Sequence, residues 1–201
     1  IEQYQKVIDG ARQVVESHSI SIDTDFDENS VLLGDICDVR DGTHDSPKYV
    51  ESDGYPLVTS KNLRDGYVDL NDVNYISKKD YDDINKRSLV EENDILMPMI
   101  GSIGNPVIVE SNPKYAIKNV ALIKVSNSKI LPHFVLLLLS SNIFKKYLLN
   151  NSKGSTQKFI SLKLLRSFEF NLPSLEIQEK LVKEYFIEKN TIKNNIDLIE
   201  N

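Results

Sequence analysis

The stretch VLLGDICDVRDGTH, residues 31–44, marks the point where the residue pattern changes from linker to folded domain. Residues 23–30, immediately before it, are acidic, polar and aperiodic, which is typical of a linker. The apolar run Val31–Val39 predicts a strand, and the Asp41-Gly42 dipeptide predicts the turn that ends it. Similar short runs follow between turn signals and predict a mixed sheet, at Tyr55–Thr59, Tyr67–Ile76, Asp94–Met99, Pro106–Val109 and Asn119–Val125.

Helices are predicted around these strands from apolar spacing and from capping residues. Ser77 and Asp80 resemble a capping box, and Pro132 suits the first turn of a helix. The predicted helices are residues 1–17, a short one from Ser77 through Ile84, one from Pro132 to Asn150 or Asn151, and Leu162–Arg166, which leads into a strand around Phe168–Leu172.

A long last helix is predicted from Pro173 to about Glu200, with Ser174 as its N-cap. Heptads written from Leu175 place apolar residues at six of eight a and d positions, with Lys189 and Gln178 at the other two. The apolar positions are Leu175, Val182, Tyr185, Ile192, Ile196 and Ile199. This spacing favours a coiled-coil arm that packs against another helix, either residues 1–17, a second domain or a second copy of the chain.

The expected fold class is therefore α+β, in three parts. Residues 1–30 form an N-terminal helix and acidic linker, residues 31–172 the main domain, and residues 173–201 the long helix. The sequence contains no internal repeat with a period of 20–50 residues, so no repeat architecture is expected.

Charge is distributed unevenly along the chain. Residues 1–110 carry 23 acidic and 10 basic side chains, whereas residues 111–168 carry 10 basic and no acidic ones, although the net charge of the whole chain is −6. An acid-free stretch of 58 residues predicts an anion-binding surface, provided that its cations share a face.

The remaining composition favours a soluble, cytoplasmic protein. The single cysteine, Cys37, excludes an internal disulfide and is expected to be buried. The longest apolar run, Ile130–Leu139, is too short to span a membrane, and no secretion signal is visible. The chain begins with Ile1, which indicates a processed product or a piece of a longer polypeptide.

Several segments, taken in order, resemble the DNA sequence-specificity subunits of bacterial Type I restriction-modification systems. The resemblance covers roughly residues 31–200. It rests on LGDICDVRDGTH (33–44), YPLVTSKNL (55–63), DILM (94–97) with GSIG (101–104), GSTQKFIS (154–161), and a helix from Pro173 that contains Glu176, Gln178 and Glu179.

This resemblance implies a mixed α/β target-recognition domain that reads half of a split double-stranded DNA target. It also implies a non-catalytic component, with no catalytic residue, metal or cofactor, which positions an adenine-N6 methyltransferase and, in some complexes, a restriction subunit. The chain has one recognition domain where full-length members have two, so that it is either a half-subunit that dimerises or a fragment. Residues 5–15 resemble the segment before the recognition domain in fused or adjacent methyltransferases, which favours a fragment.

Three loops offer the donors and acceptors that base edges and phosphates require. The first holds Arg40, Thr43, His44, Ser46 and Lys48; the second holds Ser60, Lys61, Asn62 and Arg64; the third holds Lys153, Ser155, Thr156, Gln157 and Lys158. Lys118 and Asn119, in the acid-free stretch, are further candidates. Gln157 has a second interpretation, as a brace between the domain and its long helix.

Two other functions remain open at this point. The chain could be a protein-assembly module that uses the coiled-coil helix and does not read DNA. It could also be a metal-dependent nuclease, because Asp41, His44 and Asp45 place three potential metal ligands within five residues. Asn112-Pro113-Lys114-Tyr115 is only a faint match to the adenine-methyltransferase signature Asn-Pro-Pro-Tyr, and it is interpreted as a turn.

Overall fold

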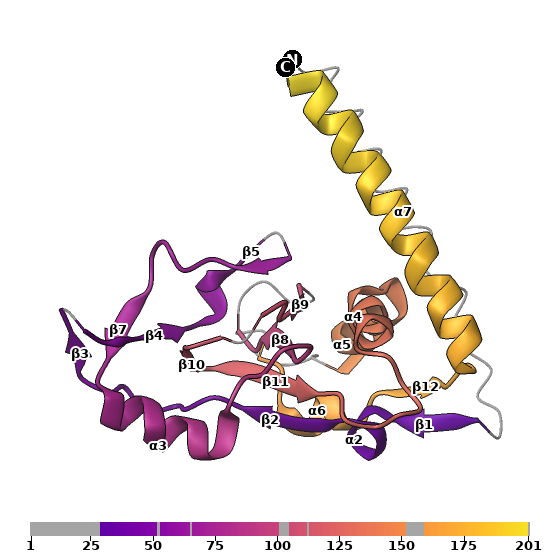
Figure 1. Cartoon of the computed structure of the whole chain (residues 1–201). Coiled ribbons are helices and arrows are strands. Elements are labelled where there is room, and N and C mark those ends of the chain that lie inside the picture. The colour runs from indigo at the N-terminus through magenta and orange to yellow at the C-terminus, as the bar shows by residue number, and fades with distance from the viewer. Residues whose placement is uncertain are drawn as a thin grey trace.

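The computed structural model describes residues 29–51, 53–64, 66–100, 105–111, 113–151 and 159–200 (Figure 1). Its central sheet has the antiparallel order β2 (Asp38–Asp41), β11 (Val120–Lys124), β8 (Ile95–Pro98) and β9 (Val107–Ile108). A second sheet has the order β10 (Ala116–Ile117), β4 (Tyr55–Val58), β7 (Asn74–Ile76) and β3 (Tyr49–Val50), and its β10–β4 pair is parallel. Two strand pairs complete the described strands, β1 (Ser30–Leu32) with β12 (Glu169–Asn171) and β5 (Leu63–Arg64) with β6 (Tyr67–Val68).

The predicted mixture of helices and a mixed sheet is confirmed. The described helices are α2 (Leu33–Ile36), α3 (Lys78–Ser88), α4 (Pro132–Ser140), α5 (Asn142–Asn151), α6 (Leu162–Arg166), α7 (Leu175–Glu200) and the 3-10 turn η1 (Ser60–Asn62). The helix predicted over residues 1–17 lies outside the described residues, as does nearly all of the linker.

The central sheet is buried on both faces because its two middle strands carry apolar residues on both sides, at all four positions of β8 and at the first four of β11, which ends at Lys124. On β8, Ile95 and Met97 belong to the main core, which β11, α4, α5 and α6 also build. Leu96 lies between these two residues and points to the opposite face, where it belongs to a second core between this sheet and β4, β5 and β10. A third, small cluster lies between the second sheet and α3. The second sheet is thus held between the central sheet and α3.

The run Val31–Val39 does not form one strand, contrary to the sequence prediction. A single helical turn, α2, separates β1 from β2. Leu33 and Ile36 are both buried, and residues three apart share one face of a helical turn. The apolar run therefore serves two strands and a turn of helix. Cys37, at the end of that turn, is buried as expected, and burial raises the pKa of its thiol to about 12.

Three other predicted elements differ in their limits. The run Tyr67–Ile76 divides into β6 and β7, because Asp69 accepts a hydrogen bond from the Asn71 backbone at 2.9 Å and turns the chain. The helix predicted from Pro132 is interrupted at Ser141, whose side chain accepts from Phe144 N at 3.2 Å and starts α5. The helix α3 has the predicted cap at Ser77 but continues to Ser88.

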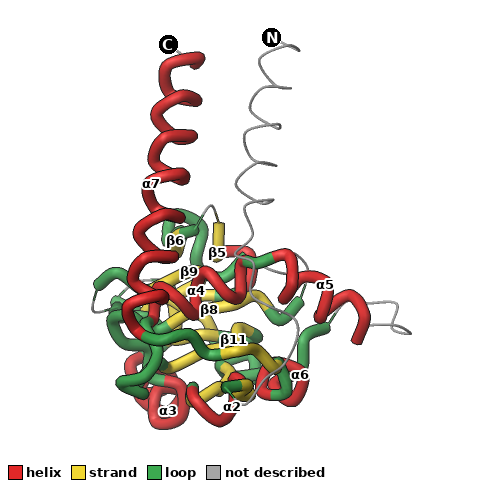
Figure 2. Tube along the Cα trace, turned by 90° about the vertical axis from the view of Figure 1, so that its right-hand side faces the viewer, coloured by secondary structure: helices red, strands yellow, loops and turns green. Residues whose placement is uncertain are grey.

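The long helix α7 stands away from the sheets, as Figures 1 and 2 show from two directions. Ser174 caps it as predicted, although the Oγ–Ile177 N distance is long at 3.5 Å. Its first turns are not an open stripe, because Val182 and Tyr185 pack on the main core of their own domain. Leu175 is exposed, and the side chains of Ile192, Ile196 and Ile199 lie outside the description. The coiled coil stays a prediction for the outer half of α7. Among the described residues, no helix is both long enough and apolar enough to cross a membrane.

The root of α7 is fixed by one buried side chain, Gln178, which is fully shielded from solvent. Its Oε1 accepts from Leu131 N at 2.9 Å, at the start of α4. Its Nε2 donates to Lys129 O at 2.9 Å and to Pro173 O at 2.8 Å. The heptad pattern assigned this residue to a helix–helix seam, whereas the structure uses it to join the helix to the domain.

An ion pair between β11 and the turn before β8 offers a test of the core. Lys124 Nζ lies 2.6 Å from Asp94 Oδ2, and Asp94 is 7% exposed. Burial raises the pKa of Asp94, so its charge depends on this cation. We expect Lys124→Met to lower the free energy of unfolding by about 2 kcal/mol at neutral pH, since it leaves a buried carboxylate unpaired.

Urea unfolding measures this loss, and the surface change Lys163→Met is the matched control. A raised folded-state pKa favours the protonated native form, so the loss should shrink as the pH falls towards the pKa of Asp94. Adding Asp94→Asn should restore part of the stability. Equal midpoints for Lys124→Met and the control would show that the pair contributes nothing.

Candidate functional site

Two of the three predicted polar loops meet beside the turn that joins β10 to β11. Thr43 N donates to Ile117 O at 3.0 Å, and Asn119 N donates to Thr43 O at 3.1 Å, which attaches the first loop to this turn. Ser60 Oγ donates to Asn119 O at 3.2 Å and attaches the second loop. We call the assembly of Thr43, His44, Ser46, Ser60, Lys118 and Asn119 the loop junction.

Asn119 occupies the centre of the loop junction because of its backbone. Its φ of 54° is left-handed, a conformation that asparagine tolerates better than most residues. The chain therefore turns sharply between the parallel strand β10 and the antiparallel strand β11. The strand predicted over Asn119–Val125 begins only at Val120 for this reason.

His44 bridges the junction to the end of β2. Its Nδ1 lies 2.8 Å from Asn119 Oδ1, and its Nε2 lies 2.8 Å from Asp41 Oδ2. Hydrogen bonds from Asn119 and then Asp41 raise the pKa of His44 above its ordinary value. The contacts therefore favour the charged imidazolium, and their contribution to stability is lost as the pH rises through this pKa.

Arg87, at the end of α3, holds Asp41 from the other side. Its Nη2 lies 2.6 Å from Asp41 Oδ1 and also donates to the carbonyls of Asp41, at 3.2 Å, and Gly42, at 2.9 Å. Arg40 donates to Arg87 O at 2.9 Å and pairs with Asp38, so it supports the helix end. Arg87 was not among the predicted site residues, because it lies beyond Ile84, where the helix was predicted to end.

The other residues predicted in these loops take different positions. Lys118 Nζ donates to Ser46 Oγ at 2.6 Å, which places a cation in the junction, and Lys48 is exposed farther along the same loop. Lys61 pairs with Asp72, and Arg64 donates to Lys61 O, both on the surface.

Asn62 is used inside its own loop. It is 3% exposed, its Oδ1 accepts from Thr59 N, and its Nδ2 donates to the carbonyls of Asp69 and Asp72. Because its polar atoms are occupied and buried, we leave Asn62 out of the candidate surface.

A family model described as the Type I restriction modification DNA specificity domain matches residues 27–200. The chain belongs to this family. A specificity domain is a non-catalytic component of a restriction-modification complex, as the sequence resemblance implied.

Two curated relatives agree with this assignment. The Type I restriction enzyme EcoBI specificity subunit of Escherichia coli is 37% identical over 132 residues, which are 65% of this chain and 28% of that protein. A putative type I restriction enzyme MjaX specificity subunit of Methanocaldococcus jannaschii is 30% identical over 139 residues, 65% of this chain and 32% of that protein. The specificity domain matches about a third of each relative's length.

Solved structures share the fold of the specificity domain. The HsdS subunit from Thermoanaerobacter tengcongensis has a TM-score of 0.68 at 16% identity, over 100% of this chain and 48% of that one. A chain from a type I R-M system solved for its assembly and conformational transition has a TM-score of 0.70 at 15% identity, over 98% of this chain and 48% of that one. The specificity domain therefore corresponds to about half of each solved chain.

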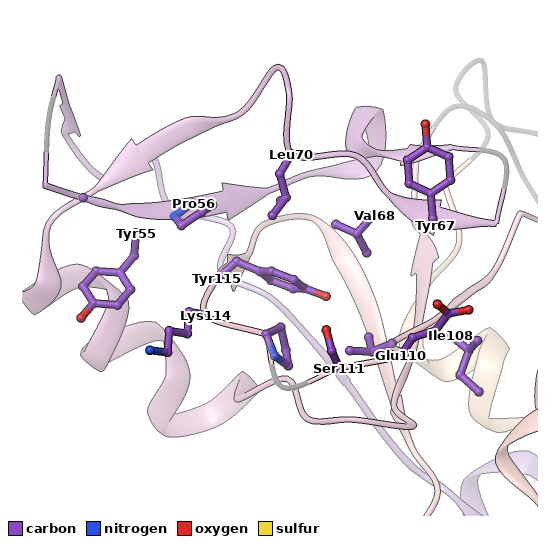
Figure 3. A pocket seen from close by; sticks show the side chains of 13 residues that line it. Tyr55, Pro56, Tyr67, Val68, Leu70, Ile108, Glu110, Ser111, Lys114 and Tyr115 are labelled. Carbon is purple, nitrogen blue, oxygen red and sulfur yellow. The ribbon is translucent and has the colours of Figure 1, made fainter.

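The specificity domain also has a hollow of about 620 Å³ at the other end of β10 from the loop junction. Figure 3 shows Tyr115 on its wall, with the hydroxyl directed between Val68 and Ser111. Tyr115 is buried, no described residue bonds its hydroxyl, and burial raises its pKa. Lys114 and Glu110 place opposite charges on the rim.

The acid-free stretch of the specificity domain does not gather all its cations at the loop junction. Lys118 lies there, but Lys124 pairs with Asp94 and Glu91, and Arg166 donates to Val39 O. The third predicted loop, Lys153 to Lys158, lies outside the described residues, as does its brace, Gln157.

The three predicted metal ligands of the specificity domain take part in hydrogen bonds within their own loop. His44 bonds Asp41 directly, and Asp45 donates its backbone N–H to Thr43 Oγ1 at 3.1 Å. Within the described ranges, no three His, Cys, Asp or Glu side chains are grouped as metal ligands would be. The nuclease hypothesis gains no support from this geometry.

Proposed function

We propose that this chain reads one half of a split double-stranded DNA target and positions an adenine-N6 methyltransferase on it, with a restriction subunit in complexes that contain one. The observation that carries the proposal is the loop junction in a chain that belongs to the DNA specificity family. Donors and acceptors that lie in loops on a rigid scaffold are what base readout requires.

The candidate DNA-contacting residues that the structure describes are exposed or half-buried, and they lie at the loop junction or close to it in the sequence. Thr43, Ser46, Ser60, Lys118 and Asn119 come from the junction, Arg40, Lys48, Lys61 and Arg64 from its surroundings, and Lys153, Ser155, Thr156, Gln157 and Lys158 from the third loop. His44 orients its neighbours and keeps half of its side chain in solvent.

We also propose a division of roles between two parts of the chain. Residues 31–172 would carry the recognition loops, and residues 173–201 the spacer helix, which docks on a second recognition half or on a second copy of the chain. The chain corresponds to about half of the solved relatives, so we propose that it supplies one recognition unit of two in a cytoplasmic complex.

A domain exchange tests the proposal directly. Residues 31–172 are replaced by the corresponding domain of another family member, and N6-methyladenine is mapped across the DNA of cells that contain the cognate methyltransferase. We expect one half of the split methylated motif to change while the other half stays. An unchanged motif would mean that this domain does not choose the sequence.

Salt dependence separates DNA reading from the assembly alternative. If the chain neutralises phosphates, its DNA affinity falls linearly in a plot of log K against log[salt]. If the chain does not bind DNA at low salt but α7 still associates with another protein helix, a protein-assembly module would be favoured.

A further inference from the structure

The backbone of Asn119 is hydrogen-bonded to both neighbouring loops, and one atom of its side chain also has a hydrogen-bond partner. Its N–H and its carbonyl bond Thr43 and Ser60, and its Oδ1 faces His44 Nδ1. Among the described residues, none accepts a hydrogen bond from its Nδ2. The residue is half-buried, and its Nδ2 is not one of the described side-chain atoms that lack both a partner and contact with solvent, so this second polar atom has access to a ligand on the surface.

The proton on His44 decides which amide atom faces outward. The Asp41 carboxylate accepts only, so His44 Nε2 carries a proton in either charge state. When His44 is charged, Nδ1 also donates, and Asn119 must present its oxygen to the ring and its NH2 outward. When His44 is neutral, Nδ1 accepts, and the amide must turn its NH2 to the ring and its oxygen outward.

We propose that Asn119 contacts a base edge in the half-target and that His44 is the positioning residue that sets whether it donates or accepts. This inference rests on the proposed DNA-reading function. An outward NH2 suits guanine O6 or N7, adenine N7 or thymine O4, whereas an outward oxygen suits adenine N6 or cytosine N4. One base pair of the target is therefore selected by the protonation state of His44.

The groups around the ring favour the donating state. Asp41 on β2 stabilises the imidazolium, while Arg87 on α3 opposes it and is itself neutralised by Asp41. Asp45 follows His44 in the loop, and Lys118 precedes Asn119 and bonds Ser46. Because the Asn119 and Asp41 bonds raise the pKa of His44, the charged form extends towards neutral pH.

The test is a selection of bound sequences from a randomised duplex pool by the full chain, at about pH 6 and about pH 9, on either side of the histidine titration. We expect the relative enrichment of one base over another to change about fivefold between the two conditions at one base-pair position, which is the effect of one hydrogen bond. All other positions should keep their preferences.

Variants assign that position to Asn119. Asn119→Asp presents an oxygen at every pH and tolerates the left-handed backbone, so it should abolish the pH response and keep the preference seen at high pH. His44→Ala should abolish the response as well. Lys79→Ala, on the exposed face of α3, should retain it.

The outcomes separate the inference from the proposed function. If the unmodified chain enriches no sequence, the proposed function fails. If it enriches a motif whose every position is independent of pH, the inference is overturned while the function stands, whether or not the variants fold. Retention of the pH response in Asn119→Asp would also overturn it.

Discussion

Gly42→Ala is expected to abolish DNA binding and to lower the free energy of unfolding by about 3 kcal/mol or more. A Cβ atom at this position would lie 2.1 Å from Ile117 O and 2.4 Å from Ile117 C, which are backbone atoms that cannot rotate away. Gly42 also donates to Val120 O and accepts from Arg87. The added methyl must therefore separate the first loop from the β10–β11 turn and so dismantle the loop junction.

Urea unfolding and duplex-binding titrations measure the two effects on the same preparation. Asp45→Ala is the matched control, because it is an exposed position of the same loop and should change stability by less than about 0.5 kcal/mol. If Gly42→Ala unfolds at the midpoint of the control, the close packing of this loop on Ile117 is not required for the fold.

The buried strands were predictable because their chemistry is local. Ile95 and Leu96 are apolar on both faces of the sheet, and this run between polar turns admits few structures other than a central strand. The Ser77–Asp80 cap and the short helix Leu162–Arg166 were equally local, and both are confirmed. Local capping and apolar runs thus account for most of the secondary structure.

The loop junction depends on contacts that no sequence window contains. His44 and Asn119 are 75 positions apart, and Arg87 and Asp41 are 46 apart, so no local pattern indicates that they bond. Asn62 shows the reverse case, because its position in a polar loop does not reveal that its side chain is buried and bonds the carbonyls of Asp69 and Asp72. The sequence therefore located the loops but not the division between residues that face outward and residues that hold the loops.

Gln178→Met is expected to lower the free energy of unfolding by about 3 kcal/mol and to loosen the angle between α7 and the domain. Methionine keeps the length and apolar volume of the side chain but loses three hydrogen bonds, each of which contributes about 1 kcal/mol. Leu131 N, Lys129 O and Pro173 O would then be left without this partner in a buried site. Urea unfolding gives the stability, and small-angle X-ray scattering of the chain gives the spread of helix positions.

Glu179→Met separates this effect from the mere introduction of methionine, since it places the same side chain at the next, exposed position of α7. This control should unfold like the unmodified chain and scatter like it. If Gln178→Met matches the control in stability, the three bonds do not hold the helix. If it loses stability but keeps the scattering profile, the packing of Val182 and Tyr185 on the main core is sufficient to fix the angle, and the spacing between two recognition units would then depend on apolar contacts rather than on Gln178.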